Sequence, residues 1–347
     1  MSEKKNYYIV EYKNNRINLN LSDKVYIKIA TLTDLYFKYT RFISDIHDND
    51  NWSISYIEFI HKDSEYEKVI IESDVEDDIV YYFSKRKKEI LIYSHNLSDR
   101  WIAQCILRLI RNIFKLLELE KRELFAHGGL ISLSGKGIAI VGGKKCGKTT
   151  TILSCIKAGA DFITNDDVSF NIENNRLMAY GWPRGVAVRG DSLKMILQKD
   201  DISNYYAELN HPGNEIILNS TFNGREPNGL IFFQPQELVT LFKCNQLVKS
   251  DLHVIIFTEF FKDKDEETQL YTIDFEEGIG ILGENLMSNP GKYNEFLLDA
   301  FVFKETNELL NDYKDLFKFV SFYRLKIGFN NVSRIPDLIK SKVDLKL

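Results

Sequence analysis

The segment from Gly142 to Thr149 reads Gly-Gly-Lys-Lys-Cys-Gly-Lys-Thr, which fits the pattern G-x-x-x-x-G-K-[ST] of loops that wrap nucleotide phosphates. Glycines let successive backbone N–H groups turn toward anionic oxygens, and the following helix offers the positive end of its dipole. In such a loop Lys148 reaches the β- and γ-phosphates, and the hydroxyl of Thr149 ligates Mg²⁺. The sequence therefore predicts a site for ATP with Mg²⁺. The predicted nucleotide-binding residues are Gly142, Gly143, Lys144, Lys145, Cys146, Gly147, Lys148, Thr149 and Thr150.

The flanks of this loop have the composition that a phosphate site requires. Residues 137–141 form an apolar run typical of a strand, and residues 150–158 are typical of a helix that ends at Gly159. Lys145 stands where many such loops carry a glycine. The alternative is a glycine-rich turn that only supports a helix.

Two adjacent carboxylates, Asp166 and Asp167, follow the loop helix at the end of a short strand over residues 161–164. Phosphoryl transfer needs a carboxylate for the metal and a second group that positions or deprotonates the acceptor. Neighbouring strand residues point to opposite faces, so both reach one site only where the backbone turns or bulges. The alternative is an acidic turn with one functional member.

The elements around these residues predict an α/β protein that leans toward α+β. Residues 130–133 and 137–141 are joined by a glycine-rich turn and indicate a hairpin, and residues 168–172 and 176–180 indicate another. Hairpins on both sides of one loop helix favour a mixed sheet over a doubly wound one.

Outside this core, the pattern predicts strands at residues 6–10, 24–29, 54–60, 69–71 and 79–83 and an amphipathic helix from Asp99 to about Lys121. Further elements are predicted after residue 190. They are a helix from 191 or 192, a strand at 230–233, a helix at 235–242, a strand at 252–257, helices near 292–302 and 305–317, a strand at 321–327 and a last helix from 336. We expect a smaller α+β domain over residues 1–123 and a P-loop domain over residues 124–347.

The order of these features resembles the catalytic domain of HPr kinase/phosphorylase. The resemblance is carried by His127-Gly128, the hairpin, the loop ending in Gly147-Lys148-Thr149, the helix stop at Gly159 and the Asp166-Asp167 pair. Relatives of this family include enzymes that phosphorylate ribosomally made precursor peptides such as lasso peptides, and the wider group shares the phosphoenolpyruvate carboxykinase nucleotide fold. The resemblance implies a mixed-sheet P-loop core of that type.

The resemblance also implies roles for individual residues. Asp166 would accept the proton of a serine hydroxyl, and Asp167 would hold Mg²⁺ together with Thr149. His127 would lie beside the γ-phosphate, and Lys148 would bind phosphate. Arg184 and Arg189 lie where relatives place positive charge toward the phosphates. Trp182 is expected in the core.

The chain departs from that family in three respects. Lys144-Lys145 replaces the usual Ser-Gly, no glycine-rich signature is evident around residues 181–200, and residues 1–97 do not resemble the usual N-terminal domain of those enzymes. These departures favour a dedicated kinase that acts on a serine or threonine of a peptide or small protein, with the N-terminal domain helping to recognise it. Alternatives are an HPr-type regulatory kinase/phosphorylase, a small-metabolite kinase and an ATP-sensing module without transfer activity.

Composition excludes several other classes. A net charge of −5 over 347 residues argues against a general nucleic-acid binder, which neutralises phosphates with Lys and Arg. The 4 cysteines contain no C-x-x-C pair, so a reduced, cytoplasmic protein is expected. No apolar run approaches the length of a membrane span. The family resemblance implies that the chain could form a homo-oligomer.

Overall fold

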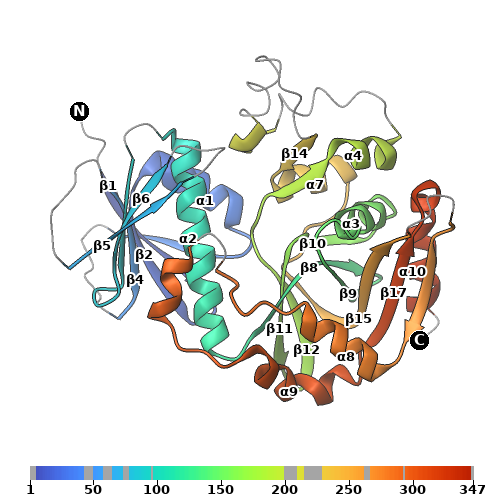
Figure 1. Cartoon of the computed structure of the whole chain (residues 1–347). Coiled ribbons are helices and arrows are strands. Elements are labelled where there is room, and N and C mark those ends of the chain that lie inside the picture. Colours follow the sequence, from blue (N-terminus) through green and yellow to red (C-terminus); the bar gives the residue numbers. More distant parts are fainter. Residues whose placement is uncertain are drawn as a thin grey trace. The chain divides into compact units, whose positions relative to one another are not determined.

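The computed structural model describes residues 5–42, 50–57, 65–72, 78–94, 97–198, 209–214, 229–261, 266–291 and 294–344. The chain divides into two compact units (Figure 1). The first comprises Met1–Glu120 and Asn289–Val302, and the second comprises Lys121–Ser288 and Phe303–Leu347. Both units contain a mixed β-sheet, so the chain has a mixed α/β architecture.

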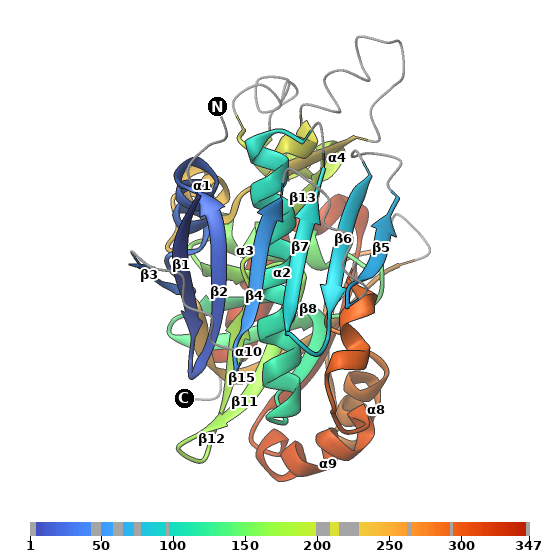
Figure 2. The same cartoon turned by 90° about the vertical axis from the view of Figure 1, so that its left-hand side faces the viewer.

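The first unit is built on a seven-stranded sheet in the order β3-β1-β2-β4-β7-β6-β5, seen face-on in Figure 2 with helix α2 behind it. The β2–β4 and β4–β7 pairs are parallel, and the other pairs are antiparallel. Alternate residues of β2, namely Ile17, Leu19 and Leu21, are buried, as expected for a sheet with one apolar face. The elements are β1 (Lys5–Tyr12), β2 (Asn15–Ser22), α1 (Asp23–Thr33), β3 (Lys38–Phe42), β4 (Trp52–Ile57), β5 (Glu67–Ile71), β6 (Ile79–Ser84), β7 (Glu89–Tyr93) and α2 (Asp99–Glu120).

The predicted strand at residues 24–29 is wrong, because this segment belongs to helix α1. The side chain of Ser22 caps the helix by accepting a hydrogen bond from the backbone N–H of Val25. Val25, Ile29 and Thr33 are the buried residues, and their spacing of four places them on one helical face. Residues 58–60 of another predicted strand lie outside the described residues.

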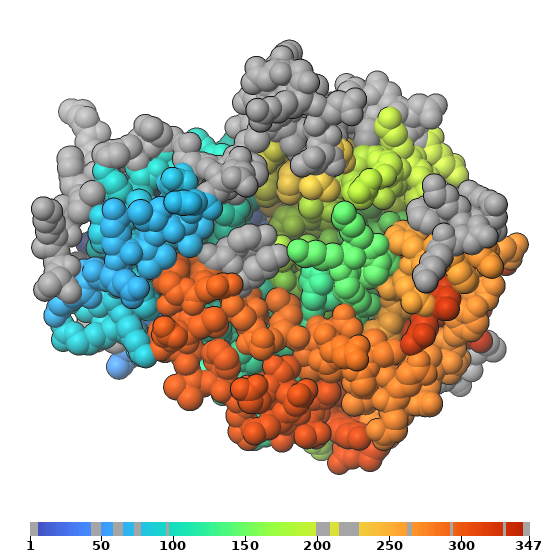
Figure 3. Space-filling model, viewed as in Figure 1, coloured from blue at the N-terminus to red at the C-terminus, as the bar shows by residue number. Residues whose placement is uncertain are grey.

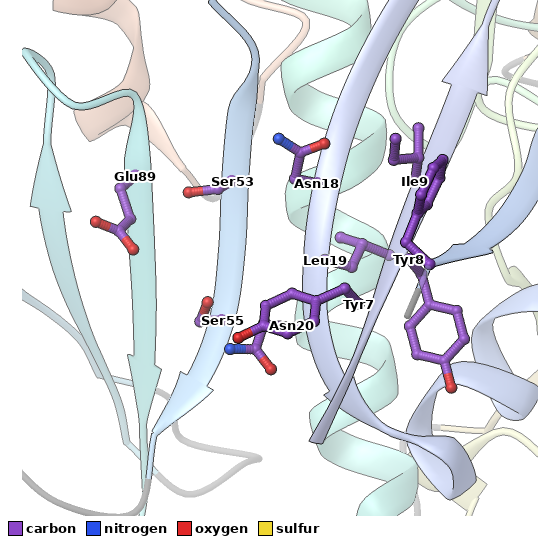
Figure 4. A pocket seen from close by; sticks show the side chains of 10 residues that line it. Tyr7, Tyr8, Ile9, Asn18, Leu19, Asn20, Ser53, Ser55 and Glu89 are labelled. Atoms are coloured by element: carbon purple, nitrogen blue, oxygen red, sulfur yellow. The ribbon is translucent and has the colours of Figure 1, made fainter. Parts of the chain in front are cut away.

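The other face of the seven-stranded sheet holds a small cavity of about 80 Å³, lined by polar and aromatic residues together with Ile9 and Leu19 (Figure 4). Asn18 pairs in register with Ser53, and Asn20 with Ser55, so two amides and two hydroxyls lie side by side. A single water needs about 10–15 Å³ of this kind of volume, so the cavity has room for several waters.

The segment Asn289–Val302 belongs to the first unit, although the sequence predicted it to lie in the second domain. The buried Asn112 donates a hydrogen bond to Asn294 over 2.7 Å. The ring of Phe296 lies 5.3 Å from that of Tyr81, and Phe301 stacks on Trp52 at 5.5 Å. These contacts join the segment to residues of the first unit that are far away in the sequence. It forms a 3₁₀ helix, η1 (Glu295–Ala300), where the sequence predicted a helix near 292–302; residues 292 and 293 lie outside the described residues.

The second unit contains an eight-stranded mixed sheet in the order β10-β8-β11-β12-β15-β17-β16, with β9 paired to both β8 and β15. The β9–β15 and β15–β17 pairs are parallel, and the rest are antiparallel. Both predicted hairpins are present as β8–β9 and β11–β12. The strands are β8 (Leu124–Leu133), β9 (Lys136–Val141), β10 (Asp161–Thr164), β11 (Asp167–Glu173), β12 (Arg176–Gly181), β15 (Lys249–Phe260), β16 (Gln269–Ile273) and β17 (Ser321–Ile327).

Helix α3 (Lys148–Lys157) packs against this sheet through a shared apolar core. Ile152 and Ile156 of the helix lie in one buried cluster with Ile131, Ile138 and Ile140 of β8 and β9. The remaining elements are β13 (Val186–Arg189), α4 (Gly190–Leu197), β14 (Leu230–Phe233), α7 (Pro235–Phe242), α8 (Phe275–Glu284), α9 (Thr306–Phe317), η2 (Phe329–Arg334) and α10 (Ile335–Asp344). Among the helices of the described residues, none is long and apolar enough to span a membrane.

Candidate active site

The loop between β9 and α3 adopts a conformation that depends on its glycines. Gly142 has a φ of 154° and Gly147 a φ of 100°, values that side chains rarely allow. A Cβ on Gly147 would also lie 2.4 Å from Cδ1 of Ile327. Gly143, by contrast, faces open space. The chain can therefore form this loop only with glycine at its two ends.

Lys145 has a φ of 62°, the conformation that glycine adopts most easily. This accounts for the glycine found there in many phosphate loops. Gly143, Lys144 and Lys145 are exposed, and green atoms, the colour of the chain around residue 150, are visible on the viewed face of the second unit in Figure 3. The middle of the loop is therefore accessible to solvent.

The side chain of Lys148 lies inside the loop. It is 6% exposed, and its Nζ donates hydrogen bonds to the carbonyl oxygens of Gly142 at 2.8 Å and Gly143 at 2.7 Å. Burial lowers the pKa of Lys148, and the nearby Cys146 and Asp166 partly oppose this shift. A buried ammonium held by the loop's own carbonyls is well placed to exchange one of them for a phosphate oxygen.

Thr149 and Thr150 follow this lysine in the first turn of helix α3. Thr149 is partly exposed, whereas Thr150 is 6% exposed. Cys146 lies beside them, with its Sγ 3.1 Å from the hydroxyl of Thr258 on β15. Only the hydroxyl of Thr149 therefore retains the accessibility that a ligand to a bound ion needs.

Strand β8 brings the other site residues to the loop because it changes its pairing partner at one point. His127 pairs in register with Asp167 of β11, whereas the next residue, Gly128, pairs with Val141 of β9. Val141 is the last residue of β9, directly before the glycine-rich loop. The end of β9 and the start of β11 therefore meet across His127.

Two glycines let the chain cross strand β8 between β10 and β11. A Cβ on Gly129 would lie 2.8 Å from the carbonyl oxygen of Thr164 and 2.9 Å from that of Asn165. The N–H of Gly128 donates to the carbonyl oxygen of Asp166 over 3.2 Å. This crossing interrupts the regular strand alternation at Asp166 and Asp167, as the sequence required if both carboxylates were to serve one site.

Arg184 shows that the two carboxylates do converge. Its Nη1 lies 3.1 Å from Oδ1 of Asp167, and its Nε lies 3.9 Å from Oδ2 of Asp166. The side chain of Asp167 is 3% exposed, while those of Asp166 and Arg184 are 24% and 23% exposed. Arg189, for which the family resemblance implied a similar position, instead forms an exposed ion pair with Asp191.

The electrostatics of His127 link all these groups. Its pKa is lowered by burial and by the positive charge of Lys148 and Arg184, against the opposing effect of Asp166 and Asp167. This shift favours the neutral form of the imidazole. Its backbone N–H donates to the carbonyl oxygen of Asn285, which ties the site to the end of helix α8.

A buried hydrogen-bond network that the sequence did not reveal supports the start of β11. The hydroxyl of Ser169 donates to Glu123 and accepts a hydrogen bond from Nε1 of Trp182 over 3.0 Å. Trp182 is 1% exposed, in agreement with its prediction as a core residue. Ser169 lies two residues after Asp167, and Trp182 two residues before Arg184, so the network fixes both ends of the ion pair. A polar residue within an otherwise apolar strand, such as Ser169, is the feature of the sequence that could have indicated this network.

The residues present fit a magnesium–nucleotide complex. Mg²⁺ is bound through one or two carboxylates together with waters and substrate phosphates, not by an all-protein cage. Within the described residues, no three His, Cys, Asp or Glu side chains form a metal cluster, so a protein cage for the metal is not present there. Asp167 supplies a carboxylate at the start of β11, and Thr149 supplies a partly exposed hydroxyl in α3. The buried Oδ1 of the adjacent Asn165 has no hydrogen-bond partner in the part of the chain described, which leaves one more oxygen acceptor at this edge.

Comparisons with known proteins give only a distant likeness. No family model matches the chain, and no curated protein matches it. Among solved structures, the chain is similar to the HPr(Ser) kinase/phosphatase from Coxiella burnetii, with 11% sequence identity and a TM-score of 0.32. The similarity covers 64% of this chain and 99% of that one. A likeness this distant carries no information about activity, which has to be argued from the residues of the site.

Proposed function

We propose that this chain is an ATP- and Mg²⁺-dependent kinase that phosphorylates a serine or threonine hydroxyl on a peptide or small protein. The observation that supports this most directly is the placement of Lys148, in the phosphate loop, within electrostatic range of Asp166 and of His127. A loop that only supported a helix would not need a buried lysine close enough to Asp166 to interact with its charge. The arrangement joins a phosphate cradle to the acid–base groups of phosphoryl transfer.

The proposed reaction assigns one role to each group. The acceptor oxygen attacks the γ-phosphorus, the bond from that phosphorus to the β–γ bridging oxygen breaks, and ADP leaves. Asp166 receives the proton of the acceptor hydroxyl, because its side chain keeps partial exposure while Asp167 is buried. Bound Mg²⁺, held by Asp167 and Thr149, would neutralise charge on the phosphate oxygens.

The surrounding cations would stabilise the transferred group. Lys148 would exchange a loop carbonyl for a phosphate oxygen, and Arg184 lies beside both carboxylates. The neutral imidazole of His127 can donate a hydrogen bond to the γ-phosphate without repelling Lys148. These contacts act where charge develops in the transition state, which is where they accelerate transfer.

The proposal is tested by separating binding from transfer. Lys148→Met should weaken ATP–Mg²⁺ binding at least tenfold by calorimetry, which is about 1.4 kcal/mol. The matched control is Lys157→Met at the other end of α3, whose side chain bonds the carbonyl oxygen of Ile196 instead. Asp166→Asn should still bind ATP–Mg²⁺ but lose phosphate transfer.

Transfer is measured with γ-labelled ATP and an array of serine- and threonine-containing peptides, beside free serine and water as acceptors. Labelling of peptides by the wild type but not by Asp166→Asn is expected. Full labelling by Asp166→Asn would remove the base assignment. Binding of ATP without transfer to any of these acceptors would favour the ATP-sensing alternative, and labelling of free serine alone would favour a metabolite kinase.

A further inference from the structure

The contact of Arg184 with both carboxylates raises a question that the proposed kinase reaction leaves open. In that reaction Asp167 holds a metal ion, yet its buried Oδ1 already pairs with Nη1 of Arg184 at 3.1 Å. Two adjacent carboxylates repel one another, and a buried one needs a partner of opposite charge. Arg184 supplies that charge in the nucleotide-free protein.

We propose that Arg184 is a displaceable counter-ion, which holds Asp167 until Mg²⁺ arrives with ATP and then turns to the phosphates. This inference rests on the proposed function. Arg184 and the metal ion compete for Oδ1 of Asp167. The site therefore binds the metal ion weakly in the absence of nucleotide and tightly in its presence.

The surroundings of Arg184 allow such an exchange. Two residues earlier, Trp182 is 1% exposed and donates its Nε1–H to Ser169, which anchors the backbone. The side chain of Arg184 is 23% exposed, and its second contact, with Asp166, is long at 3.9 Å. The guanidinium can therefore leave by side-chain rotation while the backbone stays in place.

The exchange has a thermodynamic signature. Without nucleotide, Mg²⁺ must break the 3.1 Å pair between Arg184 and Asp167, and no phosphate is present to replace it. With ATP bound, phosphate oxygens receive Arg184 bidentately, as guanidinium groups favour. Metal and nucleotide therefore bind cooperatively. Removal of Arg184 should strengthen metal binding in the absence of nucleotide and should weaken the cooperativity between metal and nucleotide.

A purely structural ion pair predicts the opposite. If Arg184 only fastened the segment after β12 to the start of β11, its removal would loosen Asp167 and weaken metal binding. The two roles are therefore separated by the sign of one change in affinity. That sign can be measured without any phosphate acceptor.

The experiment titrates Mn²⁺ alone, detected by electron paramagnetic resonance, into the nucleotide-free full chain. Arg184→Met should bind Mn²⁺ about tenfold more tightly than the wild type, and the gain in affinity on adding a non-hydrolysable ATP analogue should shrink by about the same factor. Arg176→Met is the matched control, because Arg176 is 73% exposed and pairs with Asp251 instead. It should leave both affinities unchanged.

Affinity that is unchanged or weaker in Arg184→Met would overturn the inference. If thermal melting shows that this variant is unfolded, Arg184→Lys serves instead: it keeps the charge but not the planar fork, and should show a smaller increase of the same sign. Asp167→Asn checks the underlying assignment. If it binds Mn²⁺ and nucleotide as the wild type does, the metal site of the proposed function is wrong, whatever Arg184 does.

Discussion

Replacing each aspartate of the pair separately should reveal their different positions. Asp167 is 3% exposed and lies 3.1 Å from Arg184, whereas Asp166 is 24% exposed and lies 3.9 Å from it. Asp167→Asn therefore removes the close partner of a largely buried guanidinium. Asp166→Asn removes only a long contact at the edge of the site.

These positions set the expected magnitudes. Removing one partner of a buried ion pair costs about 3–5 kcal/mol. Because Arg184 retains 23% exposure and keeps Asp166 as a second partner, we expect about 2–3 kcal/mol for Asp167→Asn. For Asp166→Asn the loss should stay below about 1 kcal/mol, as for exposed pairs.

The assay is thermal melting of the protein without metal or nucleotide. For units of about 150–250 residues, 1 kcal/mol corresponds to about 2–4 °C, so Asp167→Asn should melt about 5–10 °C lower than the wild type. Asp191→Asn, which breaks the exposed pair with Arg189, is the control and should change little. Equal losses for the two site variants, or a larger loss for Asp166→Asn, would refute this reading of the ion pair.

Three further predictions concern the loop and the histidine. Gly147→Ala should destabilise the protein by about 2–3 kcal/mol in melting experiments, because its φ is 100°, whereas Gly143→Ala should cost less than about 1 kcal/mol; similar losses would contradict this. Lys145→Gly should raise the free energy of unfolding by up to about 1 kcal/mol, and with it the melting temperature, because the lysine has a φ of 62°. Lys144 does not have a positive φ, so Lys144→Gly should lower the melting temperature. Burial lowers the pKa of His127 in the folded protein, so below about pH 6.5 this histidine is protonated more readily in the unfolded chain. The free energy of unfolding should therefore fall as the pH drops. Urea midpoints at about pH 7.5 and about pH 5.5 should then differ less in His127→Asn than in the wild type, and equal differences would exclude this effect.

The sequence alone predicted what depends on neighbouring residues. The β8–β9 and β11–β12 hairpins, helix α7 and strand β17 follow from local turn residues, apolar runs and a proline at a helix start. It missed β2, β3, β7, β13, β16 and α8, and it predicted a strand where α1 begins. In α1 the β-branched residues favoured a strand, but the cap at Ser22 and the spacing of four decided for a helix.

Part of the candidate site could likewise be read from the chain. The loop from Gly142 to Thr149 is a contiguous motif, so its glycines and Lys148 are recognisable without knowing the fold. The residues near Arg184 in the sequence do not indicate which side chain it pairs with. Arg189 carries the same charge five residues later and nevertheless pairs with Asp191 at the surface.

Only the tertiary structure decided that these groups meet. Strand β8 exchanges β11 for β9 between His127 and Gly128, and the chain crosses it next to Gly129, so residues 40 positions apart share one edge. The sequence likewise did not indicate that Asn289–Val302 belongs to the first unit, because this depends on contacts with aromatic rings and an amide of residues far away in the sequence. Local propensity acts over a few residues, whereas strand pairing and packing are set by the whole chain. The sequence therefore determined the glycine-rich loop from Gly142 to Thr149 and the helix that follows it, and the fold determined which carboxylates and cations lie near them.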